Sequence, residues 1–259
     1  MRPEPQFEGR KVMQRFWLIL VVVLAGSPAV LAQSASDYHR FDVAGTFVYA
    51  KQEANSGEQF VTEGPDTFNL LPCSPDGRDA LGANLQKIFC LRRGFKGFNG
   101  SAALNFRKHV GLMADFTGLF KTDTTVDDFG AHVDTNKIKD RTWELLGGLQ
   151  IKNNSKTARF KPSFHVLAGF ARQTSKDVQT STGPFNFTLT DHVTSFAMKI
   201  GAAADLRISK RVDLRLFEIN YNPIFAKGTR RVPGNADFDL SLAGKRADNI
   251  TLGVGIVLH

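Results

Sequence analysis

The stretch NITLGVGIVLH, residues 249–259, alternates between apolar side chains and small or polar ones. Successive residues of a β-strand point to opposite faces, so this alternation predicts a strand with one apolar face. The apolar face would carry Ile250, Leu252, Val254, Ile256 and Leu258. The opposite face would carry Asn249, Thr251, Gly253, Gly255 and Val257.

The same alternation recurs along the chain and predicts eight strands in all. The composition is rich in Gly, with 23 residues, and unusually rich in Phe, with 22 residues beside 3 Tyr and 2 Trp. This composition suits strands and tight turns better than helices. The predicted strands are 40–50, 95–106, 110–120, 142–151, 159–171, 194–208, 212–222 and 249–258.

The alternation is interrupted in one of these strands. In the segment 212–222 the apolar face passes from Leu216 to its neighbour Phe217. One extra residue at this point, a β-bulge, would restore the alternation and turn Arg215 and Glu218 to the polar side.

The connections alternate in length. Short polar turns join the second strand to the third, the fourth to the fifth and the sixth to the seventh, whereas we expect long loops at 51–94, 121–141, 172–193 and 223–248. One end of the sheet would therefore carry all the large loops, and the other the tight turns and both termini.

Alternation alone fits a soluble lipocalin-like barrel with its apolar face inside, or an outer-membrane barrel with that face outside. The polar faces favour the second, because they are rich in Gly, Ala, Ser and Thr, which suit a narrow interior. Aromatic residues also recur near the strand ends of the apolar face, as interfacial girdles do. They are Phe41, Tyr49, Phe106, Phe120, Phe196 and Tyr221. The predicted fold is an all-β, eight-stranded antiparallel transmembrane barrel.

Eight strands leave an interior that side chains can fill, so we expect no open channel. Inward charges would have to pair with one another, either as a structural salt-bridge network, which we favour, or as a gated polar path. The expected members are Asp115, Glu144, Lys199, Asp205, Arg207, Arg215 and Glu218.

The first 32 residues read as a secretory signal. Basic residues precede the apolar run FWLILVVVLA (16–25), and a small-residue site follows at Val30-Leu31-Ala32. An uncleaved anchor is the rival interpretation. Residues 33–259 would form the barrel domain, and we expect it in a bacterial outer membrane.

The chain is basic, with a formal charge of +8 that falls to +6 without the leader. Export argues against nucleic acid as the partner. Anionic membrane lipids, and lipopolysaccharide as a further candidate, are the expected partners of a monomer. Cys73 and Cys90, 17 positions apart in an exported chain, are expected to form a disulfide, with two free thiols as the alternative.

Several stretches resemble small bacterial outer-membrane barrels of the OmpA-type, or porin family, barrel domain. The resemblance rests on KPSFHVLAGFAR (161–172), YNPIFAKG (221–228), the final NITLGVGIVLH and the leader. It implies an up-and-down barrel with periplasmic termini and leaves the role open. Such barrels usually end in an aromatic residue, whereas this sequence ends in Leu258 and His259.

No hydrolase, P-loop, zinc-protease or dinucleotide motif is present, so no cofactor or metal is expected. Ser163 and His165 share a strand face, and a lipid-modifying enzyme could use such a pair, but no acidic partner is evident. The acidic loop 127–140 lacks calcium-loop spacing and reads as a solvated loop.

A basic rim formed by Lys227, Arg230 and Arg231 could contact lipopolysaccharide phosphates, or could be ordinary solvated loop charge. The predicted function is a non-enzymatic outer-membrane barrel that displays surface loops or stabilises the envelope. A small-solute channel and a lipid-modifying enzyme are the alternatives.

Overall fold

The computed structural model describes residues 37–52, 59–63, 66–70, 92–128, 133–181, 187–225, 228–231, 238–242 and 246–259. All regular structure within these ranges is β-strand. No helix long and apolar enough to cross a bilayer occurs among them. The predicted leader and both cysteines lie outside the described residues.

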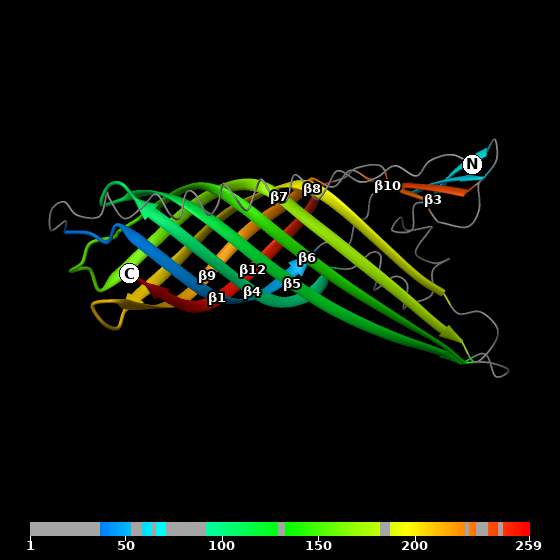
Figure 1. Ribbon diagram of the computed structural model, residues 1–259, viewed down its shortest axis with the longest axis horizontal. Helices are drawn as coiled ribbons and strands as arrows, with labels where there is room; N and C mark the ends of the chain where they lie inside the picture. The colour runs from blue at the N-terminus through cyan, green and yellow to red at the C-terminus, as the bar shows by residue number, and fades with distance from the viewer. Residues whose placement is uncertain are drawn as a thin grey trace, which may run out of the picture. The chain divides into compact units, whose positions relative to one another are not determined.

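Eight antiparallel strands close into a barrel in the ring order β1-β12-β9-β8-β7-β6-β5-β4 (Figure 1). The first and last strands of the ring pair directly, from Val43 opposite Leu258 to Lys51 opposite Ile250, so the barrel has no free edge. This confirms the predicted fold and all eight predicted strands. Their bounds are β1 Phe41–Gln52, β4 Arg93–Asn105, β5 Val110–Asp128, β6 Val133–Lys152, β7 Phe160–Ser181, β8 Phe187–Arg207, β9 Val212–Phe225 and β12 Arg246–Leu258.

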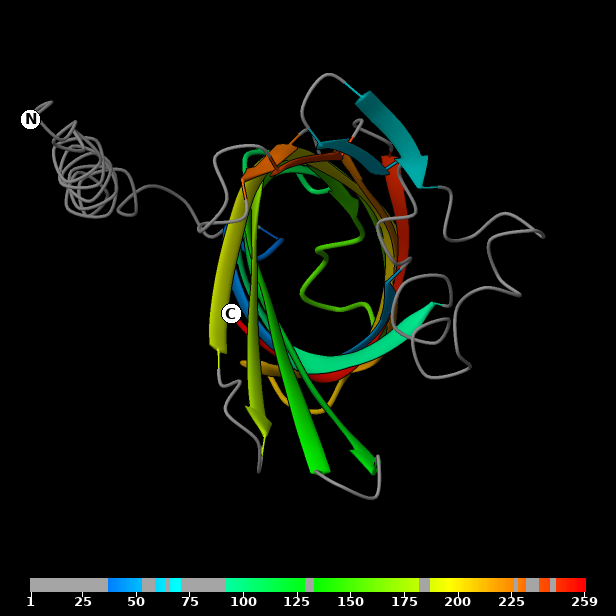
Figure 2. The same cartoon turned by 90° about the vertical axis from the view of Figure 1, so that its right-hand side faces the viewer.

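Four strands are much longer than the sequence predicts. The connections expected as loops at 121–141 and 172–193 are mostly continuations of β5–β6 and β7–β8, which stay paired out to Asp128 opposite Val133 and Gln179 opposite Phe187. Figure 2 shows these ribbons running beyond the ring of the barrel. Outside a membrane the two faces of a ribbon are both wet, so the apolar alternation that identifies a strand disappears.

The other two long connections also contain strands. They are β2 (Gln59–Glu63), β3 (Asp66–Leu70), β10 (Gly228–Arg231) and β11 (Phe238–Leu242). They pair in the order β10-β11-β2-β3, which joins the β1–β4 connection to the β9–β12 connection in one small sheet.

The predicted bulge in β9 is confirmed. Gly253 lies opposite Glu218 and Gly255 opposite Arg215, so Leu216 and Phe217 together face Val254 alone. On the other side of β9, Ala204 pairs with Phe217 and Asp205 with Arg215. The extra residue leaves the Arg215 and Glu218 side chains both buried inside the barrel.

The apolar side of the barrel is the outside. In β12 the five apolar residues from Ile250 to Leu258 are each 40–55% exposed, whereas Asn249, Thr251 and Val257 are buried. In β1 Phe47 is 59% exposed between the buried Thr46 and Val48. We call the outward apolar face of the eight strands the apolar belt. A soluble barrel would have the reverse arrangement.

Candidate functional site: the charged interior of the barrel

Lys199 on β8 organises the first cluster of interior charges. Its ammonium nitrogen lies 2.6 Å from an Asp115 carboxylate oxygen on β5 and 3.6 Å from a Glu144 oxygen on β6. Asp115 also accepts a hydrogen bond from Asn99, and Glu144 accepts one from Asn222 at 2.7 Å. All of these groups are buried, and one cation serves two carboxylates, each of which also accepts a hydrogen bond from an asparagine amide.

Arg215 organises a second cluster in the middle of the interior. Its guanidinium donates to Asp205 at 2.9 Å and to Glu218 at 2.7 Å. Asn220 then donates to Glu218 and to Thr251, both at 3.0 Å. The β9 bulge is what makes this cluster, because without the extra residue Arg215 and Glu218 could not both face inward.

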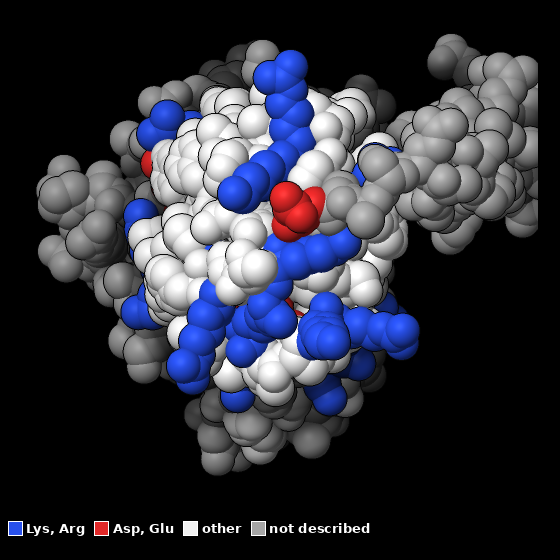
Figure 3. Space-filling view, turned by 90° about the vertical axis from the view of Figure 1, so that its left-hand side faces the viewer, with Lys and Arg blue, Asp and Glu red and all other residues white. Residues whose placement is uncertain are grey.

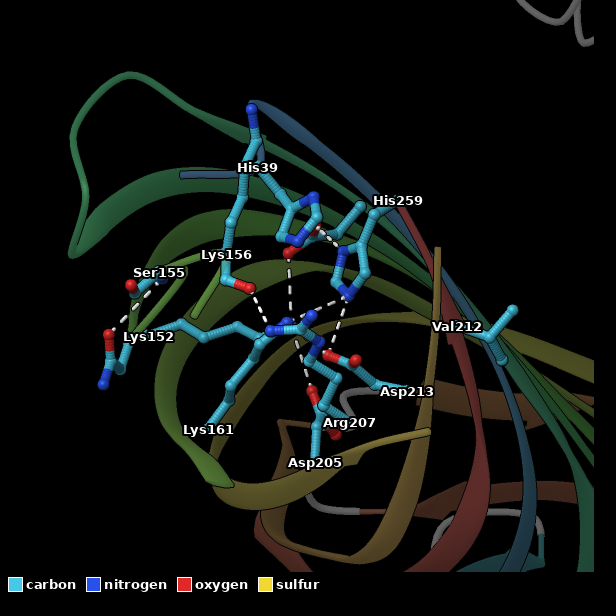
Figure 4. Close-up of polar contacts among 12 residues, drawn as sticks. His39, Lys152, Ser155, Lys156, Lys161, Asp205, Arg207, Val212, Asp213 and His259 are labelled. Carbon is cyan, nitrogen blue, oxygen red and sulfur yellow. Dashed lines mark hydrogen bonds and ion pairs between the residues drawn. The ribbon is translucent and has the colours of Figure 1, made fainter. Parts of the chain in front are cut away.

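A third cluster closes the end of the barrel that carries the tight turns (Figure 4). Lys152 bridges Asp42 at 3.2 Å and Asp205 at 2.9 Å, so Asp205 links this cluster to Arg215. Lys161 lies 2.7 Å from Asp213. The second and third clusters therefore form one connected network from Asp42 to Glu218.

His259, which follows β12, is the centre of the third cluster. Its Nδ1 lies 2.6 Å from Asp42, and its Nε2 lies 2.7 Å from Asp213. The ring of His39 stacks on it, with centroids 3.9 Å apart. The start of β1 and the end of β12 are thus held together at the turn end by an ion pair and a ring contact.

The two histidines have opposite electrostatic tendencies. Burial disfavours the charged ring of His259, but its hydrogen bonds to Asp213 and Asp42 outweigh this effect and raise its pKa above the ordinary value. Burial, together with the positive charges of His259 and Lys161, lowers the pKa of His39 to about 4. We therefore expect His259 to be the charged member of the stacked pair.

His165 lies in the interior, where its Nε2 is 2.8 Å from the Asn220 side-chain oxygen. Gly201 lies between them, paired with His165 on one side and with Asn220 on the other. A methyl group at Gly201 would overlap the Asn220 oxygen and approach His165 Nε2 to 2.7 Å. Ser163, the residue that shares the face of His165, hydrogen-bonds the Ala203 carbonyl at 3.4 Å.

These contacts cross the bore rather than run along its wall. Lys199 and Asp115 are carried by strands three positions apart in the ring of eight, as are Lys152 and Asp42. Asn222 and Glu144 span the same separation. Side chains that reach this far fill the interior of a barrel of this size.

The structure brings six of the seven predicted interior charges into ion pairs, three in the Lys199 cluster and three in the Arg215 cluster. The seventh, Arg207, departs from the prediction: its guanidinium donates to the backbone carbonyl of Lys156 at the turn end. The sequence analysis missed Asp42, Lys152, Lys161, Asp213 and His259. Asp42, Lys161 and Asp213 already lie on the inward face of predicted strands, and extending the alternation by one position would have added Lys152 and His259.

The predicted rim is only partly described. Lys227 lies outside the described residues, and Arg230 and Arg231 form the end of β10, paired with Leu240 and Asp239. An ion-pair cluster that the sequence did not suggest lies beyond the interior, where Arg93 contacts Asp123 and, at 2.5 Å, Asp140. All three residues belong to stretches that were expected to be loops, 51–94 and 121–141.

Within the described ranges no group of three or more His, Cys, Asp and Glu side chains could hold a metal ion. In the acidic stretch 127–140, Asp127 and Asp128 are the last residues of β5, and Asp140 forms an ion pair with Arg93.

The distribution of apolar and charged side chains indicates what surrounds the barrel. An apolar belt outside and ion pairs inside are stable where hydrocarbon surrounds the protein. Closure of the ring satisfies the backbone groups that an open sheet would leave unpaired in lipid. Barrels built in this way are found in bacterial outer membranes, and the chain is an outer-membrane barrel.

No family model matches the chain, and no curated protein matches it. Among solved structures it is similar to the attachment invasion locus protein Ail of Yersinia pestis in complex with the heparin analogue sucrose octasulfate, with 13% identity and a TM-score of 0.41, covering 85% of this chain and 100% of that one. It is similar to the outer membrane protein OprG of Pseudomonas aeruginosa, with 12% identity, a TM-score of 0.42 and coverage of 86% and 97%. It is also similar to the outer membrane protease OmpT of Escherichia coli, with 12% identity, a TM-score of 0.46 and coverage of 88% and 99%.

Proposed function

We propose that this chain is a non-enzymatic and non-conducting outer-membrane barrel that holds extended β-ribbons outside the membrane. The observation that carries the proposal is the connected ion-pair network that crosses the interior, from Asp42 at the turn end to Glu218 in the middle, with the Lys199 cluster beyond it.

The network supports a closed interior because moving any one member leaves a buried charge without its partner. Breaking such a pair typically costs about 3–5 kcal/mol. A channel open to ions would have to separate Lys199 from Asp115 and also Lys152 from Asp42 and Asp205. The summed free energy of these separations is much larger than thermal energy, so the interior stays closed.

The Ser163–His165 pair gives little support to the alternative of a lipid-modifying enzyme. The two side chains hydrogen-bond different partners, Ala203 and Asn220, and both are buried in the interior. An acyl ester in the surrounding bilayer lies on the other side of the barrel wall. The Ser163–His165 pair therefore gives the lipid-modifying alternative no geometric support.

The ribbons support a role in display. Residues 121–128 of β5 continue past the belt, and eight residues of strand span roughly 25 Å. Arg93, held between Asp123 and Asp140, fixes the base of the β5–β6 ribbon to β4. Contact with an external partner would use this projecting part.

Reconstitution into planar bilayers tests the proposal. The protein, shown to be folded by its altered gel mobility before boiling, should give no ion conductance. A variant in which Lys199 and Arg215 are both replaced by Ala should conduct, which establishes that the assay detects an opened interior. Steady conductance by the unaltered protein would favour the small-solute channel instead.

A further inference from the structure

The turn end of the barrel carries a concentrated positive charge. We call the exposed bases in its three turns the turn-end basic cluster: Arg107, Lys108, Lys156, Arg159, Lys210 and Arg211. Figure 3 shows Lys and Arg side chains spread over this end of the molecule, with little acidic surface between them. In the described residues 37–40, 106–109, 153–159 and 208–211, Asp37 is the single acidic residue.

The opposite end of the barrel has a much smaller excess. The strand extensions at 121–128, 133–141, 172–181 and 187–195, together with the strand ends at 51–52, 92–96 and 246–248, contain 11 basic and eight acidic residues. At the turn end seven basic residues stand against the one acidic residue, so positive charge is concentrated there.

The bases lie where the belt stops. Phe106 is 52% exposed and is followed at once by Arg107 and Lys108. Arg159 directly precedes Phe160, which is also 52% exposed. Consecutive residues in an extended chain are about 3.3 Å apart, so these charges lie at the level of the lipid headgroups when the aromatic rings lie at the edge of the hydrocarbon.

We propose that the turn-end basic cluster binds the anionic headgroups of phospholipids in the membrane leaflet at this end of the barrel. Arg and Lys donate charge-assisted hydrogen bonds to phosphate oxygens, while their aliphatic stems cover the end of the apolar belt. The proposal rests on the membrane location derived above. Beyond that location, it specifies the class of lipid that is bound and the leaflet in which binding occurs.

The cluster would act as an anchor that fixes the depth of the barrel. Each base beside an anionic surface strengthens binding about fivefold at moderate salt. Because the interaction is between exposed charges, it weakens as salt shortens the screening length from about 8 Å at physiological ionic strength.

The test compares two variants of the full chain in detergent. In the first, Arg107, Lys108, Lys210 and Arg211 are each replaced by Gln. In the second, the matched control, Lys137, Lys139, Arg172 and Lys176 on the strand extensions are each replaced by Gln. The turn-end backbone remains intact, because Lys108 and Arg211 make their hydrogen bonds there with backbone groups: their carbonyls accept from Asn154 and His259, and the Arg211 N–H donates to Ser209.

Native mass spectrometry then counts the phosphatidylglycerol and phosphatidylcholine molecules retained by each protein. The unaltered chain and the control should retain phosphatidylglycerol in at least tenfold preference, and the turn-end variant should lose most of that preference. If the four-residue variant fails to fold, the separate pairs Arg107/Lys108 and Lys210/Arg211 should each lose part of it.

Equal preference in all three proteins would overturn the proposal. So would binding of the unaltered chain to isolated peptidoglycan that disappears in the turn-end variant without any change in lipid preference. Failure of the membrane assignment itself would look different, because the protein would then not acquire heat-sensitive gel mobility on mixing with vesicles of either lipid.

Discussion

The ammonium nitrogen of Lys199 lies 2.6 Å from a carboxylate oxygen of Asp115, although their strands are three positions apart in the ring. This contact spans the bore and joins opposite parts of the wall. With Glu144 3.6 Å from the same ammonium group, one base serves two acids. The interior of the barrel is therefore held together by charge in the way that the core of a soluble protein is held by apolar packing.

Replacing Lys199 by Met should destabilise the barrel by about 3–5 kcal/mol, because Asp115 and Glu144 would remain buried without a cation. Unfolding by urea in lipid vesicles measures this free energy. The control is Lys51→Met, which removes an exposed lysine at the end of β1 and should change stability little. Equal stability of both variants would contradict the structural role of the cluster.

Replacing Gly201 by Ala should also destabilise the barrel, because the added methyl group meets Asn220 and His165 and forces their hydrogen bond apart. We expect a loss of about 1–3 kcal/mol. Gly45 provides the matched control, since a methyl group there meets no atom within 4 Å. A Gly45→Ala variant as unstable as the Gly201→Ala variant would refute this explanation.

Replacing Val254 by Lys should cost about 2–4 kcal/mol, because the residue lies near mid-belt, opposite Phe47. Val126→Lys is the control: Val126 is 61% exposed and Val254 55%, but Val126 lies on the β5 extension. The unfolding free energies of the two variants in vesicles should differ by most of that cost. Similar unfolding free energies would mean that both positions face the same medium, which would contradict a hydrocarbon-covered belt.

Stability should depend on pH through the stacked histidines. The pKa of His259 is raised in the fold, so its stabilisation is complete below about 6.5 and is lost as pH rises through the higher folded value. The pKa of His39 is lowered to about 4, so its contribution is lost as pH falls from about 6.5 towards 4. The groups facing them are Asp42, Asp213 and Lys161.

Urea midpoints measured from pH 5 to pH 9 test this dependence. The unaltered protein should weaken on the alkaline side, and His259→Gln should remove that alkaline decline and reduce the acid-side loss, because the charge of His259 contributes to the lowered pKa of His39. His39→Phe should keep the ring contact and remove the acid-side loss. An alkaline decline that persists in His259→Gln would show that another group is responsible.

The strands inside the membrane could be predicted from the sequence because lipid outside and polar groups inside impose strict alternation. This rule located all eight strands and the bulge at Leu216 and Phe217. It failed for residues 121–128, where both faces of the ribbon meet water and Thr and Asp occupy either side. The partners of the interior charges could not be predicted, since pairing across the bore depends on the ring closing and not on spacing along the chain.

Arg207 illustrates the same point. Alternation assigns it to the inward face with Asp205, but it is the last residue of β8, where the wall ends and its side chain can reach the Lys156 carbonyl instead. His259 is the opposite case. It follows the last strand, yet the inward parity of its position places it between Asp42 and Asp213.

Trp143 offers the most direct test of the central claim that hydrocarbon covers the belt. It packs against Phe116 and Phe120 with centroids 5.5 and 5.2 Å away, and it is the one tryptophan of residues 33–259. In vesicles of lipids brominated along the acyl chains, its fluorescence in a chain of residues 33–259 should be strongly quenched, while aqueous iodide should have little effect. Quenching by iodide with no effect of brominated lipid would contradict the account.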